Sequence, residues 1–152
     1  MNLADEITIP GQRDTVFANL IDPEILKRCI PGCEELVKTS DTEFTAKVVL
    51  KIGPVKAKFS GTVTLDITAA PERLTLSGAG EGGLAGFAKG GADVEMIDQG
   101  DETLLRYTAK AETGGKIAQL GARLIESTAK KLSKTFFGNF EKIMLGEDDD
   151  NN

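Results

Sequence analysis

Residues 77–92 read SGAGEGGLAGFAKGGA, and seven of these sixteen positions are glycine. The segment 78–83, GAGEGG, matches the G-x-G-x-x-G pattern of dinucleotide-binding loops. That pattern requires a strand before it and a helix directly after it, because the helix N-terminus holds the pyrophosphate. Residues 84–92 contain three more glycines, which disfavour a helix by up to about 1 kcal/mol each, and residues 92–96 alternate as a strand does. The absence of that helix argues against a nucleotide site.

The spacing of these glycines favours another explanation. Gly78, Gly80 and Gly82 are two residues apart, so an extended strand places all three on one face. They continue the row of Leu74 and Leu76, which is the expected inner face. Two interpretations remain open: the missing side chains leave a space inside the protein, or they only let the sheet bend and another backbone approach. The first interpretation predicts a cavity.

Alternation of apolar and polar residues predicts strands on both sides of this stretch. The longest run is 55–68, which has one apolar and one polar face. Such a pattern is typical of an antiparallel strand that is covered on one side only. The other expected strands are 2–9, 43–52, 73–83, 87–97 and 102–113.

Three segments carry helical signals instead. Asp14 can cap a short helix at 14–21, and Pro23 suits the first position of a second short helix at 23–29. Apolar residues then recur every three or four positions through 116–145, which predicts one long amphipathic helix. The expected α+β domain therefore spans 1–146, and the acidic segment 147–152 is expected to be a disordered tail.

Composition restricts the class of protein. The chain has 152 residues and a net charge of −6, which suggests one domain and argues against nucleic acid as the main partner. It has no long apolar run and no basic, apolar start typical of a secretion signal, so the expected location is cytoplasmic. Histidine is absent, which removes Ser-His-Asp and Cys-His catalytic arrangements. Cys29 and Cys33 are expected to be reduced thiols, and no cofactor or metal is expected.

Four segments resemble the CoxG family of carbon monoxide dehydrogenase subunits: CIPGC (29–33), KIGPVKAKFSGTV (51–63), LSGAGEGGLAGFAKGGADV (76–94) and GGKIAQLGARLIESTAKKL (114–132). This family is part of the START-like, or Bet v 1-like, SRPBCC superfamily. The resemblance implies a helix-grip fold, in which a curved antiparallel seven-stranded sheet wraps around a long C-terminal helix and two short helices follow the first strand. It also implies a non-catalytic accessory protein of a molybdenum-containing CO dehydrogenase or a related hydroxylase, coupled to the cell membrane.

The expected ligand site lies between the sheet and the long helix. Its lining should come from alternate strand positions and one helix face: Val48, Leu50, Phe59, Val63, Leu65, Leu76, Gly78, Gly80, Phe87, Met96, Tyr107, Leu120, Leu124, Thr128 and Phe136. An apolar site of this kind suits a quinone or a lipid acyl chain. Tyr107 is the only tyrosine, and its hydroxyl could donate a hydrogen bond to a quinone carbonyl.

Two alternatives to the ligand-binding accessory protein stay open: a cyclase-like or dehydratase-like enzyme that uses the cavity, and a docking adaptor with a filled core. Charge is relevant to docking, since 114–145 contains six basic residues and two acids. A second basic patch on the outer sheet face comprises Lys47, Lys51, Lys56 and Lys58. These patches predict weak docking to a partner enzyme or to anionic lipid at the inner face of the cell membrane.

Overall fold

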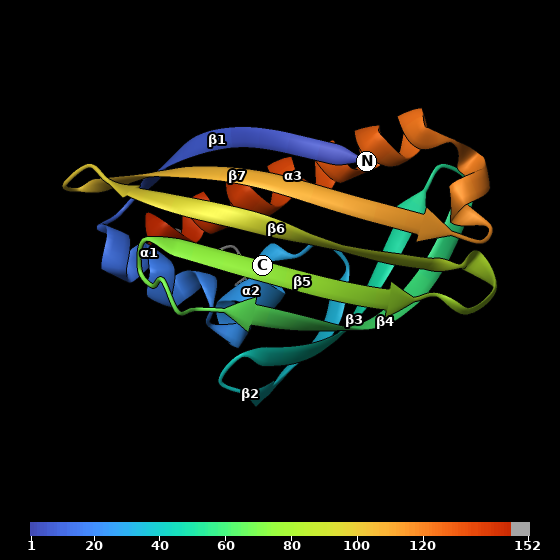
Figure 1. The fold of residues 1–152 in the computed structure, drawn as a ribbon, viewed down its shortest axis with the longest axis horizontal. Coiled ribbons are helices and arrows are strands. Elements are labelled where there is room, and N and C mark those ends of the chain that lie inside the picture. The colour runs from blue at the N-terminus through green and yellow to red at the C-terminus, as the bar shows by residue number, and fades with distance from the viewer. Residues whose placement is uncertain (147–152) are drawn as a thin grey trace.

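The computed structural model describes residues 1–146, and the acidic tail expected at 147–152 lies outside the described residues. Seven strands form one antiparallel sheet, with the helices on one side of it (Figure 1). The strands are β1 (Asn2–Pro10), β2 (Cys33–Ser40), β3 (Glu43–Ile52), β4 (Val55–Asp66), β5 (Arg73–Glu81), β6 (Phe87–Asp98) and β7 (Glu102–Gly114). The helices are α1 (Arg13–Leu20), α2 (Pro23–Cys29) and α3 (Ala122–Met144), with two 3-10 turns, η1 (Gly83–Ala85) and η2 (Ile117–Leu120).

The sheet order is β1-β7-β6-β5-β4-β3-β2, so every strand except β1 lies beside the one that follows it in sequence. This arrangement confirms the expected α+β helix-grip fold. The sequence pattern did not give bounds for β2, because this edge strand is mostly exposed and its apolar alternation is weak. Its pairing with β3 is also irregular, with register shifts between Cys33 and Glu35 and between Lys38 and Ser40.

The expectation of one continuous helix over 116–145 is wrong at Gly121. This residue has φ +97° and ψ 152°, which is not a helical conformation, and it separates η2 from α3. Glycine adopts such angles without the steric cost of a Cβ atom. The long helix therefore begins at Ala122, and η2 forms a separate short turn before it.

Buried apolar side chains form two separate clusters rather than one continuous core. The first core cluster gathers residues from α1, α2, α3 and the sheet: Ile9, Val16, Leu20, Cys29, Phe44, Leu65, Leu74, Val94, Met96, Leu105 and Phe140. The second core cluster comprises Ile52, Phe59, Ala85 and Ile117. It joins the β3–β4 turn, η1 and η2, which lie at the end of the strands opposite α1 and α2 (Figure 1).

Candidate functional site

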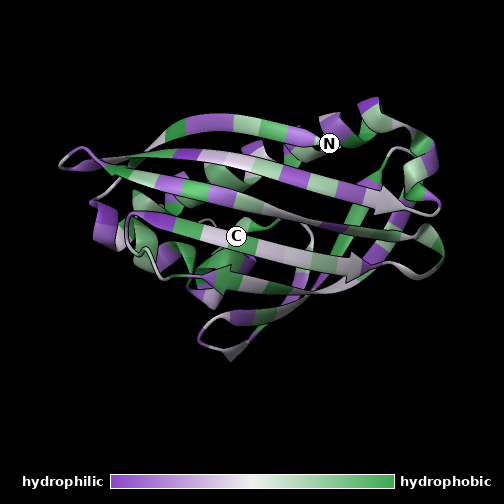
Figure 2. Ribbon diagram, viewed as in Figure 1, coloured by the Kyte–Doolittle hydropathy of each residue, from purple (hydrophilic) through white to green (hydrophobic). Residues whose placement is uncertain are grey.

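A band of small side chains crosses the inner face of the sheet between the two core clusters. One row of mutually paired residues runs across five neighbouring strands, β3, β4, β5, β6 and β7: Ala46, Gly61, Gly80, Ala88 and Thr113. We call this set the small-residue row. No side chain in it is larger than threonine, and the half of β5 near η1 is correspondingly pale in Figure 2. The sheet therefore contributes very little side-chain volume here.

The three glycines of β5 and its end differ in what surrounds them. A Cβ atom on Gly80 would lie 3.6 Å from the Ser60 carbonyl oxygen, which is an ordinary contact distance. A Cβ atom on Gly78 would lie 3.3 Å from Val63 Cγ2, whereas one on Gly82 would lie only 2.7 Å from the Phe59 ring. The close-contact interpretation therefore holds at Gly82, while Gly80 has room for a Cβ atom at ordinary contact distances.

The helix residues opposite this band are only partly buried. Thr128 and Leu132 continue the stripe of α3 that includes Leu124 and Phe136, yet both remain partly exposed to solvent. Val48 has the same property on β3, and neither Val48 nor Leu132 belongs to a core cluster. These residues are partly exposed, as Leu124 and Phe136 on the same helix stripe also are, but unlike those two they pack against neither core cluster.

The structure divides the expected lining residues among these regions. Those that pack in or against the first core cluster are Val63, Leu65, Leu76, Met96, Tyr107 and Phe136. Those that pack in or against the second are Leu50, Phe59, Leu120 and Leu124. Val48, Gly78, Gly80 and Thr128 belong to neither cluster. The expected lining residues therefore do not all belong to one apolar cluster.

Phe87 does not share this inner face. The inner positions of β6 are Ala88 and the alternate residues that follow it, so Phe87 belongs to the opposite set. Its side chain is 41% exposed, and its ring lies beside Gly114 on β7. The expectation that Phe87 shares a face with Met96 fails because one residue has an odd position and the other an even one along the same strand.

Tyr107 faces inward and stacks on Phe137 of α3, with 5.3 Å between ring centroids. It is only partly buried. Within residues 1–146 its hydroxyl makes no hydrogen bond. This hydroxyl is therefore available as a donor to a bound molecule. Thr128 differs, because its hydroxyl already donates to the Leu124 carbonyl at 2.8 Å.

Ionisable groups with shifted pKa values lie outside the small-residue row. Burial raises the pKa of the Cys29 thiol to about 11, although the positive charge of Arg28 lowers this pKa by a smaller amount. Burial also raises the pKa of the Cys33 thiol, and hydrogen bonds from Thr68 lower the pKa of the exposed Asp66 carboxyl. Arg106 on β7 binds Glu6 of the neighbouring strand β1, with 3.0 Å between Nε and Oε2. The described inner face therefore gathers no acid–base pair.

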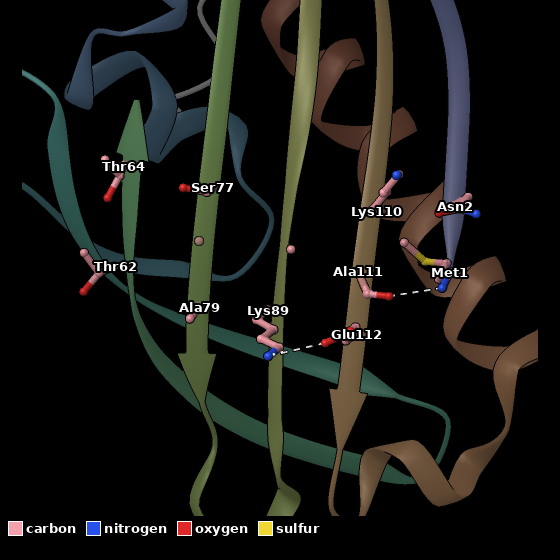
Figure 3. A pocket seen from close by; sticks show the side chains of 12 residues that line it. Met1, Asn2, Thr62, Thr64, Ser77, Ala79, Lys89, Lys110, Ala111 and Glu112 are labelled. Atoms are coloured by element: carbon pink, nitrogen blue, oxygen red, sulfur yellow. Dashed lines mark hydrogen bonds and ion pairs between the residues drawn. The ribbon is translucent and has the colours of Figure 1, made fainter. Parts of the chain in front are cut away.

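A separate hollow of about 730 Å³ lies on the outer face of the sheet (Figure 3). It is lined by Met1, Asn2, Thr62, Thr64, Ser77, Gly78, Ala79, Lys89, Gly90, Lys110, Ala111 and Glu112. Its charged groups are already engaged in part: Lys89 lies 3.4 Å from Glu112, and the Met1 ammonium donates to the Ala111 carbonyl at 3.1 Å. This hollow shares Gly78 with the expected site but opens on the opposite side of the sheet.

The part of the chain that the structure describes has no helix that is both long and apolar enough to cross a bilayer. The same residues contain no group of three or more histidine, cysteine or acidic side chains positioned to hold a metal ion.

Solved structures share this architecture. A conserved protein from Geobacillus kaustophilus is 31% identical, with a TM-score of 0.89 and 96% of each chain covered. A START superfamily protein from Mycobacterium smegmatis is 12% identical, with a TM-score of 0.71 over 95% of this chain and 97% of that one. The Zhui aromatase/cyclase from Streptomyces sp. R1128 is 10% identical, with a TM-score of 0.65 over 94% and 95%. The last two likenesses show the fold alone.

A comparison with curated proteins gave no match. The family model that describes the CoxG subunit of carbon monoxide dehydrogenase matches residues 6–144, which is nearly the whole described chain. The segments that suggested this resemblance, including the glycine-rich stretch of β5 and β6 and the start of the C-terminal helix, all fall inside the match. The chain belongs to the CoxG family of carbon monoxide dehydrogenase subunits.

Proposed function

We propose that this protein is a non-catalytic accessory protein of a carbon monoxide dehydrogenase or a related molybdenum hydroxylase. In this role it binds an apolar molecule, a quinone or a lipid, between the sheet and α3, and it helps couple the enzyme to the membrane. Membership of the CoxG family supports the accessory role. The observation that carries the ligand site is the small-residue row, which crosses five strands between two separate core clusters.

The energetics of the inner face favour an apolar occupant. Val48, Thr128 and Leu132 leave apolar surface accessible to water although they face inward. Burying such surface is favourable by roughly 25 cal/mol per Å², so a flat or elongated apolar molecule would gain free energy by covering it. Tyr107, which packs against the first core cluster, adds a hydroxyl with no hydrogen bond within residues 1–146, which suits a ligand that reaches it with a carbonyl.

An enzyme of the same fold is the first alternative. The Zhui aromatase/cyclase has a similar architecture, but a shared fold does not imply that two proteins catalyse the same reaction. Acid–base catalysis in this space would need groups with suitable pKa values within reach of one substrate. On the described inner face the Thr128 hydroxyl is bonded to its own helix, and the Tyr107 hydroxyl has no hydrogen-bond partner. The arrangement supports binding over catalysis.

A docking adaptor with a filled core is the second alternative. It would require one continuous cluster of buried side chains from α1 to η2. The buried residues instead fall into two clusters, with a glycine and alanine band between them. This division supports the ligand-binding form of the accessory role.

The ligand site can be tested by filling the small-residue row. Gly80→Leu should place a side chain into the space without a clash at Cβ, and it should lower binding of decylubiquinone, followed by tyrosine fluorescence, by more than about tenfold. Ser77→Leu is the matched control, because Ser77 lies on the outer face of the same strand. Organic extraction and mass spectrometry of the purified wild-type protein should also recover an apolar molecule.

Two results would contradict the ligand site. One is a wild-type protein that yields no apolar molecule on extraction and does not bind decylubiquinone or a fluorescent fatty acid. The other is a Gly80→Leu variant that binds these probes as tightly as the Ser77→Leu control does.

A further inference from the structure

We infer that the end of the molecule formed by the β3–β4 turn, η1 and η2 is the surface that docks on an anionic lipid bilayer. This docking rests on the proposed coupling to a membrane, and it adds the surface, the residues and the lipid charge. We call this end the basic tip and define it as residues 51–58, 82–91 and 114–125. The three segments meet through the second core cluster.

Buried residues hold the exposed groups of the basic tip in place. Ile52, Ala85 and Ile117 are each at most 8% exposed and pack together in the second core cluster. Each is adjacent in sequence to an exposed residue: Lys51, Leu84 and Lys116. The second core cluster therefore fixes three outward-pointing side chains at one end of the molecule, from three segments that are far apart in the chain.

The apolar part of the basic tip projects from the protein. Leu84 is 95% exposed, so its side chain has almost no contact with the rest of the chain. Phe87 is three residues away, 41% exposed, and is the first residue of β6, directly after the β5–β6 connection. An apolar side chain held out on a short turn gains free energy when it enters the boundary between headgroups and acyl chains.

The charged side chains of the basic tip are all positive. The basic tip contains six basic residues and no acidic ones: Lys51, Lys56, Lys58, Lys89, Lys116 and Arg123. Because the whole chain carries −6 and the basic tip carries +6, the remaining residues carry −12. Lys58 and Lys89 have acidic partners, Glu34 and Glu112. Within residues 1–146 the other four cations form no ion pair.

The pairing of β3 and β4 places two of these cations side by side. Lys51 pairs directly with Lys56 across the turn, on the same face of the sheet. Like charges opposite each other disfavour strand pairing, so this arrangement costs stability in the isolated protein. A surface of anionic headgroups would relieve that repulsion, since each cation near such a surface contributes favourably.

The opposite end of the strands is acidic. The turns and termini there carry exposed carboxylates: Asp14, Asp41, Asp66, Glu72, Asp98, Asp101 and Glu102. The β3–β4 and β5–β6 connections lie at one end of the molecule and the β6–β7 turn lies at the other (Figure 1). A negatively charged surface therefore attracts the basic tip and repels the far end, which orients the protein as it approaches.

Lipid fits the basic tip better than an acidic protein does. The cations come from the strand ends and helix start that meet at the second core cluster, together with one projecting leucine, and this spread suits a fluid layer of headgroups. Lysine side chains can also extend along such a boundary, with the stem in an apolar layer and the charge in water. A stable protein interface would need a larger apolar core than Leu84 and Phe87 supply.

Vesicle flotation of the full chain tests this surface. The wild-type protein should float with vesicles that contain phosphatidylglycerol, and much less with phosphatidylcholine alone or at high salt. Leu84→Ser and the double variant Lys51→Gln/Lys56→Gln should each lower partitioning about tenfold. Two matched controls should partition as the wild-type protein does: Val37→Ser, which changes a 45% exposed apolar residue on β2, and Lys27→Gln/Lys38→Gln, which neutralises exposed lysines on α2 and β2.

Several results would overturn the basic tip as the docking surface. One is that the wild-type protein binds vesicles equally well whatever their lipid charge. Another is that the Leu84 and Lys51/Lys56 variants bind as well as the controls. A wild-type protein that ignores these vesicles but is retained by immobilised poly-glutamate would make the basic tip a site for an acidic protein. In each case the recovery of an apolar molecule on extraction would leave the ligand part of the proposed function intact.

Discussion

The two halves of the inner face are built from the same strands but are filled differently. Toward α1 and α2, the first core cluster includes Phe44, Met96 and Phe140, each at most 2% exposed. A few residues further along the same strands, the small-residue row offers alanine, glycine and threonine to a partly exposed stretch of α3. The sheet therefore supplies large side chains to the first core cluster and only small ones to the neighbouring stretch.

The largest effect should come from truncating the filled half. Phe140→Ala removes a fully buried ring from the first core cluster and should lower the free energy of unfolding by about 3–5 kcal/mol. Leu132→Ala, on the same helix but opposite the small-residue row, should cost less than half as much, because Leu132 is already partly exposed. Urea denaturation of both variants measures the contrast. Equal losses would mean that the two halves are packed alike.

A smaller effect is expected when alanine replaces each of two glycines on the inner face. A Cβ atom on Gly90 would overlap the Lys110 carbonyl oxygen of the neighbouring strand, so Gly90→Ala should destabilise the protein by about 1–3 kcal/mol. A Cβ atom on Gly80 meets only ordinary contacts, so Gly80→Ala should change stability by less than about 1 kcal/mol. Thermal unfolding of the two variants provides the test. If Gly80→Ala were as destabilising as Gly90→Ala, the space beside Gly80 would not exist.

The two cysteines should differ in their reactivity, because one lies in the first core cluster and the other does not. Cys29 is fully buried in the first core cluster, whereas Cys33 is partly exposed and pairs with Val48 on the inner face. Iodoacetamide at mildly alkaline pH should therefore alkylate Cys33 in the native protein and leave Cys29 unmodified until the chain unfolds. Peptide mass spectrometry identifies the modified residue. Rapid native alkylation of Cys29 would show that the filled half opens readily.

The smallest expected effect is the pH dependence that Cys29 adds to stability. Burial raises the pKa of its thiol from 9.0 to about 11, so the folded state favours the neutral form. Its stabilising contribution should be complete below pH 9 and should be lost as the pH rises toward 11. Urea midpoints across this range should fall more steeply for the wild-type protein than for Cys29→Ala. Parallel slopes would remove Cys29 as the cause.

Local patterns in the sequence predicted most of the elements. The Asp22-Pro23 step marks the start of α2, and the Asp22 carboxylate indeed accepts a hydrogen bond from the Glu24 amide at 2.9 Å. Strict alternation over 55–68 predicted a strand, because inner residues must be apolar and outer residues can be polar, and β4 ends two residues earlier, at Asp66. The break at Gly121 was not predicted, because the apolar repeat continues through this residue. The spacing of apolar residues carries no information about a positive φ angle.

The candidate site depended on information that the sequence does not carry locally. The glycines of β5 were visible as a row, but their alignment with Gly61 and Ala88 depends on strand register. Register is set by turns and by packing across the whole sheet, so the five-strand row emerges only in three dimensions. The same holds for the basic tip, whose cations come from three distant segments joined by Ile52, Ala85 and Ile117.

The irregular edge strand β2 has a consequence for the behaviour of the protein at high concentration. An unpaired, regular edge is a template on which another molecule can add a strand, and this is a common route to aggregates. The register shifts near Cys33 and Lys38 interrupt the regular spacing of amides and carbonyls along β2, and Glu34, Glu35 and Lys38 place charges beside it. These features disfavour the addition of a further strand at this border of the sheet.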